Sequence, residues 1–83
     1  IMKTQLITPE KILFEGEAAY VQVPGAEGEF GVLPGHAPTI STLKEGVIAV
    51  DLAGGEHKEF PVSSGVAEVT PERVTLLVEV SPA

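Results

Sequence analysis

The segment IAVDLAGGEHKEFPV, residues 48–62, predicts a β-hairpin. Apolar residues stand at every second position from 48 to 52, which is the period of a strand with one buried face. The pair Gly54-Gly55 follows, and two glycines between apolar runs favour a tight turn. The alternation resumes with Phe60 and Val62 on the return strand. This stretch therefore favours antiparallel β structure.

Alternating segments recur along the rest of the chain, and turns rich in proline or glycine separate them. The alternating positions are Thr4, Leu6 and Thr8, then Ala19, Val21 and Val23, then Val74, Leu76, Val78 and Val80, with another strand beginning at Ile12. Turns are expected at Pro9-Glu10, Pro24-Gly25, Pro34-Gly35 and residues 70–73. Both Pro-Gly pairs fit type II turns. No window has the helical period, and about nine candidate strands predict a single all-β sandwich domain.

Composition excludes several classes of protein. The chain has 83 residues, a net charge of −7, five basic residues and no cysteine. Nucleic-acid binding is not expected, because affinity for phosphates rests on Lys and Arg. Disulfides and thiolate metal sites are excluded. No apolar run approaches the roughly 18–20 residues of a membrane span. We therefore expect a soluble intracellular domain with a packed core.

Residues that could carry chemistry are few. Ser63-Ser64-Gly65 lacks the spacing of a nucleophile elbow, and neither histidine, His36 or His57, stands in a metal-ligand motif. The pairs Glu15/Glu17 and Glu27/Glu29 could each lie side by side on a strand, but nothing in their surroundings predicts a raised pKa. No catalytic residue, metal or cofactor is expected. The alternatives are a stand-alone β-sandwich enzyme, binding domain or metal-dependent domain that uses His36, and an adaptor that recognises another helical partner through the loop around His36.

The stretch GEFGVLPGHAP, residues 28–38, suits neither a regular strand nor a helix. Pro34-Gly35 predicts a turn, and Pro38 restricts Ala37 to extended geometry. A stiff loop presenting His36 and Ala37 would lose little entropy on binding. Local physics leaves two interpretations open, a tight corner between sheets or a recognition surface.

Residues 27–38 resemble the signature of the epsilon subunit of F-type ATP synthases, in which PGHAP is highly specific. Other segments that resemble this family are Leu6-Ile7-Thr8-Pro9-Glu10, Val21-Gln22-Val23-Pro24-Gly25, Thr42-Leu43-Lys44-Glu45-Gly46, Ser64-Gly65-Val66-Ala67-Glu68-Val69 and Val74-Thr75-Leu76-Leu77. The resemblance covers nearly all 83 residues in order. Val66 departs from it, standing where the family often has a second glycine. The resemblance implies a flattened sandwich of about ten short, mostly antiparallel strands.

The resemblance implies a mechanical role. The epsilon subunit is a non-catalytic part of the central stalk, the rotor of the F1 complex. It passes rotation driven by proton flow, or sodium flow in some species, to catalytic sites on other subunits. The implied location is peripheral, on the cytoplasmic face of the bacterial inner membrane or the stromal face of the chloroplast thylakoid. The membrane would be reached through partners only, and no cofactor is implied.

Two binding surfaces follow from the resemblance. The contact with the c-ring of the membrane sector maps onto Glu27, Gly28 and Glu29. The contact with the gamma subunit maps onto Thr8, His36, Ala37, Pro38, Thr39, Ile40, Ser41 and Thr42. The family usually continues into a C-terminal helical hairpin, which is absent from residues 1–83. Inhibition of ATP hydrolysis and ATP binding, which depend on that hairpin, are therefore not expected here.

Overall fold

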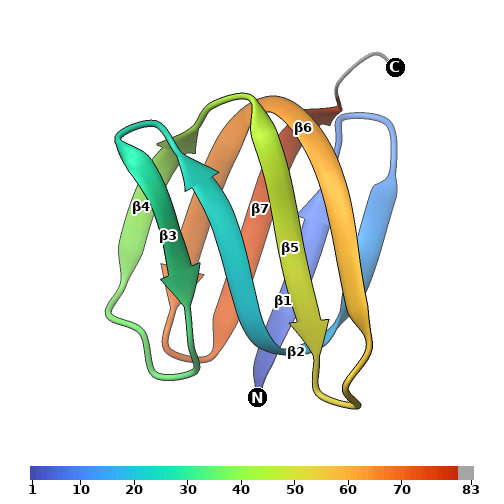
Figure 1. Cartoon of the computed structure of the whole chain (residues 1–83), viewed down its shortest axis with the longest axis vertical. Coiled ribbons are helices and arrows are strands. Elements are labelled where there is room, and N and C mark those ends of the chain that lie inside the picture. The colour runs from blue at the N-terminus through green and yellow to red at the C-terminus, as the bar shows by residue number, and fades with distance from the viewer. Residues whose placement is uncertain (81–83) are drawn as a thin grey trace.

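Seven β-strands arranged in two layers make up the part of the chain that the computed structural model describes, residues 1–80 (Figure 1). They are β1 (Met2–Ile7), β2 (Ile12–Gly25), β3 (Gly28–Val32), β4 (Thr39–Leu43), β5 (Gly46–Leu52), β6 (His57–Thr70) and β7 (Arg73–Val80). The described residues contain no helix, hence none that could cross a membrane. The all-β prediction is confirmed.

The two layers share their longest strands. One layer contains the first part of β2, then β1, β7, the second part of β6, and β4. The other contains β3, the second part of β2, β5 and the first part of β6. Within residues 1–80 every pairing is antiparallel except that of β1 with β7. In Figure 1, β2 and β6 bend from one layer into the other.

The predicted strand count was wrong, because β2 and β6 are single strands of 14 residues each. The ladder of β2 with β5 shifts register between Ala18 and Tyr20, and that of β6 with β7 shifts between Val62 and Ser64. Such irregularities bend a strand and change which side chains face inward without ending it. Nine or ten short strands were therefore expected where seven occur.

The irregularity in β2 also moves one predicted core position. The pattern placed Ala19 on the buried face with Val21 and Val23, yet Ala18 is fully buried and Ala19 is exposed. Before the bend the even positions of β2 face the core, and after it the odd positions do. A strict period of two cannot represent this switch.

Pro24-Gly25 is not a turn, contrary to prediction. Both residues are the buried end of β2, and the turn lies at 26–27. A Cβ on Gly25 would lie 2.6 Å from the Gly28 carbonyl oxygen, so the hairpin strands approach too closely for any larger residue. The Pro24 carbonyl accepts a hydrogen bond from the Lys44 N–H at 2.9 Å. Packing and strand pairing therefore override the local turn preference.

The core lies between the layers and is aliphatic. Its fully buried members include Met2, Leu6, Ala18, Val21, Val23, Val32, Ile48, Val50, Val62, Ala67, Val74 and Leu76. Phe14 and Phe60, one from each layer, pack against this core with ring centroids 5.9 Å apart. The predicted stripe on β7 is buried through Val78 and ends at Val80, which is 46% exposed.

Candidate functional site

The loop between β3 and β4 contains the type II turn that the sequence predicts. Gly35 has φ +88°, and the His36 N–H donates to the Leu33 carbonyl at 3.1 Å. Pro34 and Gly35 thus occupy the second and third positions, where a fixed negative φ and a positive φ are required. The Gly35 φ and the His36–Leu33 hydrogen bond confirm the predicted turn. It could be predicted because each of these backbone preferences belongs to the residue itself.

This loop is fastened to a second turn. The Gly35 N–H donates to the Pro71 carbonyl at 2.9 Å, which joins the loop to the hairpin between β6 and β7. That hairpin is closed by the Thr70 hydroxyl, which accepts from the Arg73 N–H at 3.1 Å. His36 is therefore carried by a loop held at both its own turn and a neighbouring one.

His36 is half-buried, and its tautomer follows from its contacts. Its Nδ1 lies 2.7 Å from the Ala37 carbonyl oxygen, which can only accept, so Nδ1 carries the proton. In the neutral ring, Nε2 is left as an acceptor. The ring also lies against Phe30, with centroids 6.4 Å apart, and the Thr39 hydroxyl donates to the same Ala37 oxygen at 2.9 Å.

A groove of about 560 Å³ brings together most of the predicted contact residues. It is lined by residues 26–28, Phe30, His36 and residues 39–42. β3 and β4 are not paired with each other; they belong to different layers, so an opening remains between them. Ile40 is 75% exposed, which is high for a large apolar side chain on a strand. One continuous surface thus carries both predicted contact regions.

The two ends of this groove are distinct. The turn at 26–27 lies at one end of the sandwich, and the loop 33–38 lies at the other (Figure 1). Ala37 and Pro38 of that loop are exposed, whereas Thr39 and Ser41 are half-buried in β4. The His36 loop and the 26–27 turn therefore lie at opposite ends of the fold, whereas the predicted gamma contacts 39–42 run along β4 between them and reach the turn at Thr42.

Thr8 lies apart from the other predicted contacts. It is 6% exposed, follows β1, and closes a turn in which its hydroxyl accepts from the Lys11 N–H and donates to the Lys11 carbonyl, both at 3.1 Å. Its neighbours Ile7 and Pro9 line a different hollow, together with Leu77 of β7. The structure does not bring Thr8 into the groove with His36.

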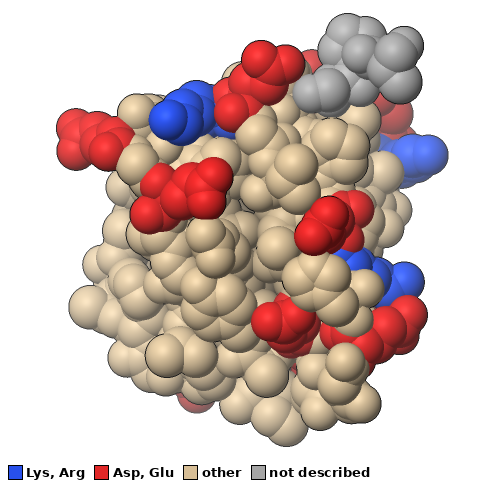
Figure 2. Space-filling view, viewed as in Figure 1, with Lys and Arg blue, Asp and Glu red and all other residues tan. Residues whose placement is uncertain are grey.

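The acidic end of the groove is built from two turns. The Ala26 N–H donates to the Thr42 carbonyl at 2.8 Å, which ties the β2–β3 turn to the end of β4. Glu27 and Glu29 are exposed here, and Glu45 is exposed in the adjoining β4–β5 turn. On the face shown in Figure 2, acidic side chains are more widespread than basic ones, including at this end.

A short chain of hydrogen bonds leads to Glu29 along the outer face of the β3–β2–β5–β6 layer. The Tyr20 hydroxyl donates to Oε1 of Gln22 at 3.0 Å, and Nε2 of Gln22 donates to Oε1 of Glu29 at 2.9 Å. Sequence reasoning missed this arrangement. The signal was available, because Tyr20 and Gln22 stand two apart and face outward together, and Gln22 pairs with Gly31 in the next strand.

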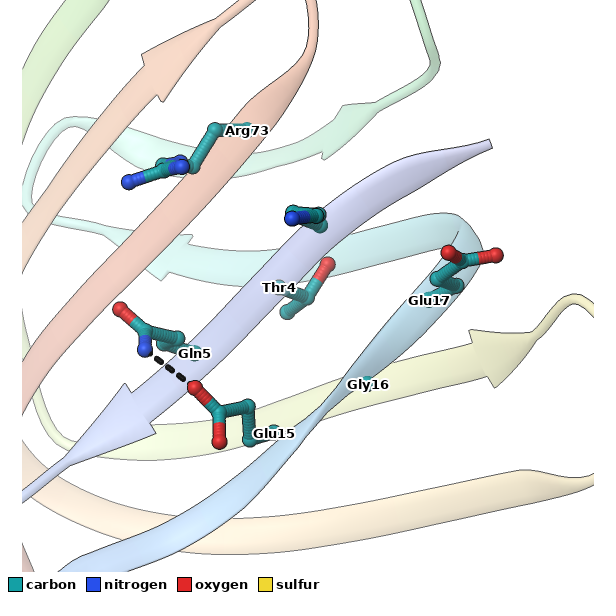
Figure 3. Close-up of a pocket in the computed structure, with 7 residues that line it drawn as sticks. Thr4, Gln5, Glu15, Gly16, Glu17 and Arg73 are labelled. Carbon is teal, nitrogen blue, oxygen red and sulfur yellow. Dashed lines mark hydrogen bonds between the residues drawn. The ribbon is translucent and has the colours of Figure 1, made fainter.

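A second hollow lies on the outer face of the other layer (Figure 3). Its volume is about 230 Å³, below the roughly 300 Å³ at which ligand pockets begin. Lys3 and Arg73 line it together with Glu15 and Glu17, and Gln5 donates to Glu15 at 2.5 Å. The two glutamates share the hollow, but their carboxylates lie apart, on either side of Gly16 (Figure 3). Charges of both signs alternate here, so no single ligand charge is favoured.

His57 lies on β6 between two carboxylates. Its Nδ1 is 2.5 Å from Asp51 and its Nε2 is 3.0 Å from Glu59. Hydrogen bonds to Asp51 and then to Glu59 raise the pKa of His57 above its usual value, because both partners favour the protonated ring. The two carboxylates lie on opposite ring nitrogens, and residues 1–80 contain no group of three side chains suited to a metal ion.

Comparisons with known proteins agree with one another. The family model described as ATP synthase, Delta/Epsilon chain, beta-sandwich domain matches residues 1–81. An ATP synthase epsilon chain of Caulobacter vibrioides is 50% identical over 74 residues, covering 89% of this chain and 85% of the relative. One of a Bradyrhizobium species (strain BTAi1) is 47% identical over 76 residues, covering 92% of this chain and 56% of the relative.

Solved structures show the same fold. A chain of the Euglena gracilis mitochondrial ATP synthase, from a structure of its OSCP, F1 and c-ring parts, superposes with a TM-score of 0.86 at 28% identity. The match covers 93% of this chain and 49% of that one. Many matched relatives are longer: the chain spans 56% of the Bradyrhizobium sequence and 57% of one from Rhodopseudomonas palustris strain BisB5.

Proposed function

This chain belongs to the ATP synthase Delta/Epsilon chain β-sandwich family, and we propose that it serves as the part of the central stalk that links the gamma subunit to the c-ring. Family membership makes it a domain of a non-catalytic subunit rather than an enzyme in its own right. In this role it would pass rotation driven by ion flow to catalytic sites on other subunits. Proton coupling and a peripheral position on the cytoplasmic face of a bacterial membrane are part of the proposal.

The groove between β3 and β4 is the observation that carries this proposal. It joins an acidic turn to a rigid loop with an exposed apolar side chain, Ile40, beside it. A subunit that connects two partners needs two contact regions held at a fixed separation. Here strands β3 and β4, with the loop 33–38 between them, set that separation.

The gamma subunit is proposed to bind at the end that carries His36. Nε2 of His36 is free to accept a hydrogen bond, and Ala37, Pro38 and Ile40 offer exposed apolar surface beside it. The loop is fastened at the Gly35 N–H, so little conformational entropy would be lost on binding. Thr8, whose hydroxyl is occupied in the turn with Lys11, lies apart from this end and would take part only if gamma also covered the separate hollow beside Pro9 and Leu77.

The c-ring is proposed to bind at the end that carries Glu27, Gly28 and Glu29. Both carboxylates are exposed, and the chain as a whole carries a charge of −7. Complementary charge on basic loops would speed encounter and fix the orientation of the contact. Such an interaction weakens as salt screens it, with a Debye length of about 8 Å at physiological ionic strength.

Co-elution with purified gamma subunit on size exclusion tests the first contact. We expect a complex with the wild-type chain and a weaker one with His36→Ala, whose fold should survive because the side-chain hydrogen bond of His36 is local. His57→Ala is the matched control, since His57 lies on β6 away from the groove. Failure of the wild-type chain to bind gamma would contradict the stalk assignment.

Binding to isolated c-rings tests the second contact. Glu29→Lys should weaken binding at low salt, where electrostatic contacts are strongest. Glu72→Lys is the control, because it makes the same change of charge on an exposed glutamate in the β6–β7 turn, at the other end of the sandwich. Equal affinity of the Glu29→Lys variant and the wild-type chain would remove this turn from the interface.

A further inference from the structure

We propose that Gln22 and Tyr20 are positioning residues that hold the Glu29 carboxylate in its binding orientation, and that Gly31 is glycine because the Tyr20 ring needs its space. This inference rests on the proposed contact between Glu29 and the c-ring. It adds three residues that lie outside the groove and outside both predicted contact regions.

The direction of each hydrogen bond sets the direction of the next. The Tyr20 hydroxyl donates to Oε1 of Gln22, so the amide nitrogen Nε2 faces the other way and donates to Glu29. Because a carboxylate only accepts, Nε2 must face Glu29, and the Tyr20 hydroxyl holds the same amide from its oxygen side. Without the hydroxyl, the amide would keep one anchor and would be free to swing away from Glu29. A chain of this kind polarises each member and strengthens the last bond.

Gly31 makes room for this arrangement. A Cβ on Gly31 would lie 2.6 Å from Cζ of Tyr20 and would overlap its hydroxyl as well. Gln22 pairs directly with Gly31 in the β2–β3 ladder, so the Tyr20 ring lies over β3 beside the Gln22 amide. Any side chain at position 31 would therefore displace the tyrosine from its hydrogen bond.

The arrangement leaves part of the carboxylate free for a partner. Oε1 of Glu29 accepts from Gln22, whereas Oε2 accepts no side-chain hydrogen bond from residues 1–80. A glutamate held in one rotamer loses less entropy when it pairs with a basic group. Ordering a flexible side chain costs about 0.5–1.5 kcal/mol, equivalent to roughly a 2- to 12-fold change in affinity.

The test measures c-ring affinity of Gln22→Leu alone and in a Glu29→Ala background. We expect Gln22→Leu to weaken binding roughly 2- to 12-fold in the wild-type chain, and to have no further effect once Glu29 is alanine. Tyr20→Phe keeps the ring and removes only the hydroxyl, so it should weaken binding in the same direction by less. Gln5→Leu is the control, because Gln5 bonds Glu15 in the same way on the other layer.

Side-chain couplings measured by NMR give a readout that does not depend on the c-ring. Glu29 should occupy one rotamer in the wild-type chain and average over several in Gln22→Leu. The positioning role would be overturned if Glu29→Ala weakened c-ring binding while Gln22→Leu bound as tightly as the wild-type chain. It would also be overturned if Glu29 averaged over several rotamers in the wild-type chain. Either result would leave the proposed function standing. If Glu29→Ala itself binds normally, the c-ring contact fails and the role of Gln22 in it fails too.

Discussion

The Gly35 N–H and the Pro71 carbonyl, 2.9 Å apart, join two turns that are far apart in the sequence. Each turn is rigid by itself, one through Pro34-Gly35 and the other through the Thr70 hydroxyl. Their connection means that the loop bearing His36 cannot move without moving the β6–β7 hairpin. The orientation of His36 is therefore set by the fold as a whole.

Gly35→Ala should destabilise the domain by about 1–2 kcal/mol, because alanine at φ +88° incurs the cost of left-handed geometry. No atom lies within 4 Å of a Cβ built at this position, so the whole effect would come from the backbone. Gly35→Asn should recover part of the loss, since asparagine tolerates this region better. Chemical unfolding measures the change. Equal stability of the alanine variant and the wild-type chain would show that the turn does not require positive φ.

Gly31→Ala should release Tyr20 from the surface of β3. The chain has one tyrosine and no tryptophan, so its intrinsic fluorescence reports on Tyr20 alone. We expect greater quenching by iodide and a loss of about 1 kcal/mol, equivalent to one hydrogen bond. Gly54→Ala is the control, since no atom lies within 4 Å of its Cβ position. Identical quenching in the two variants would contradict the packing of Tyr20 on Gly31.

Leu76 and Leu77 offer a matched pair on opposite faces of β7. Leu76 is fully buried and Leu77 is 46% exposed. Leu76→Ala should cost about 2–5 kcal/mol through lost burial and the cavity left behind. Leu77→Ala should stay within about 0.5 kcal/mol of the wild-type chain. The unfolding midpoints of the two variants measure the difference. A larger loss of stability for Leu77→Ala than for Leu76→Ala would contradict the assignment of Leu76 to the buried face of β7.

The His57 cluster should make stability depend on pH. Its pKa is raised by Asp51 and Glu59, so the stabilisation is fully present below the unfolded pKa of about 6.5. It is lost as pH rises through the higher pKa of the folded state. His57→Gln should remove this part of the pH dependence in thermal unfolding. An unchanged pH profile in that variant would show that the cluster does not couple to folding.

The all-β class and the 33–36 turn could be predicted because each depends on local preferences. Pro34 and Gly35 suit their own backbone angles, and alternating residues suit a half-buried strand. The same dipeptide at Pro24-Gly25 led to a wrong turn prediction, because its conformation is set by contacts with residues that are distant in the sequence. A Cβ on Gly46 would lie 2.8 Å from Cβ of Pro24, a contact between strands that no local rule contains.

The groove could not be predicted for a related reason. It exists because β3 and β4 belong to different layers, and layer membership depends on where β2 and β6 bend. No proline marks the bend at Ala18–Tyr20. Pro61 and the run Ser63-Ser64-Gly65 flank the bend at Val62–Ser64, but they suggest a turn that ends a strand, whereas β6 continues through them. The residues of the two proposed contact regions were predicted from the resemblance, but their positions on the fold required the strand pairing.

The parallel pairing of β1 with β7 has a consequence for how this domain is made. Lys3 pairs with Arg73 and Ile7 with Leu77, so the first strand finds one of its two partners in the last. During synthesis on the ribosome, the edge of β1 that pairs with β7 stays unpaired until residues 73–77 have emerged. Closing so long a loop is entropically costly, and topologies of this kind fold in roughly milliseconds to seconds. Synthesis rather than local hairpin formation therefore sets the moment at which the sandwich closes.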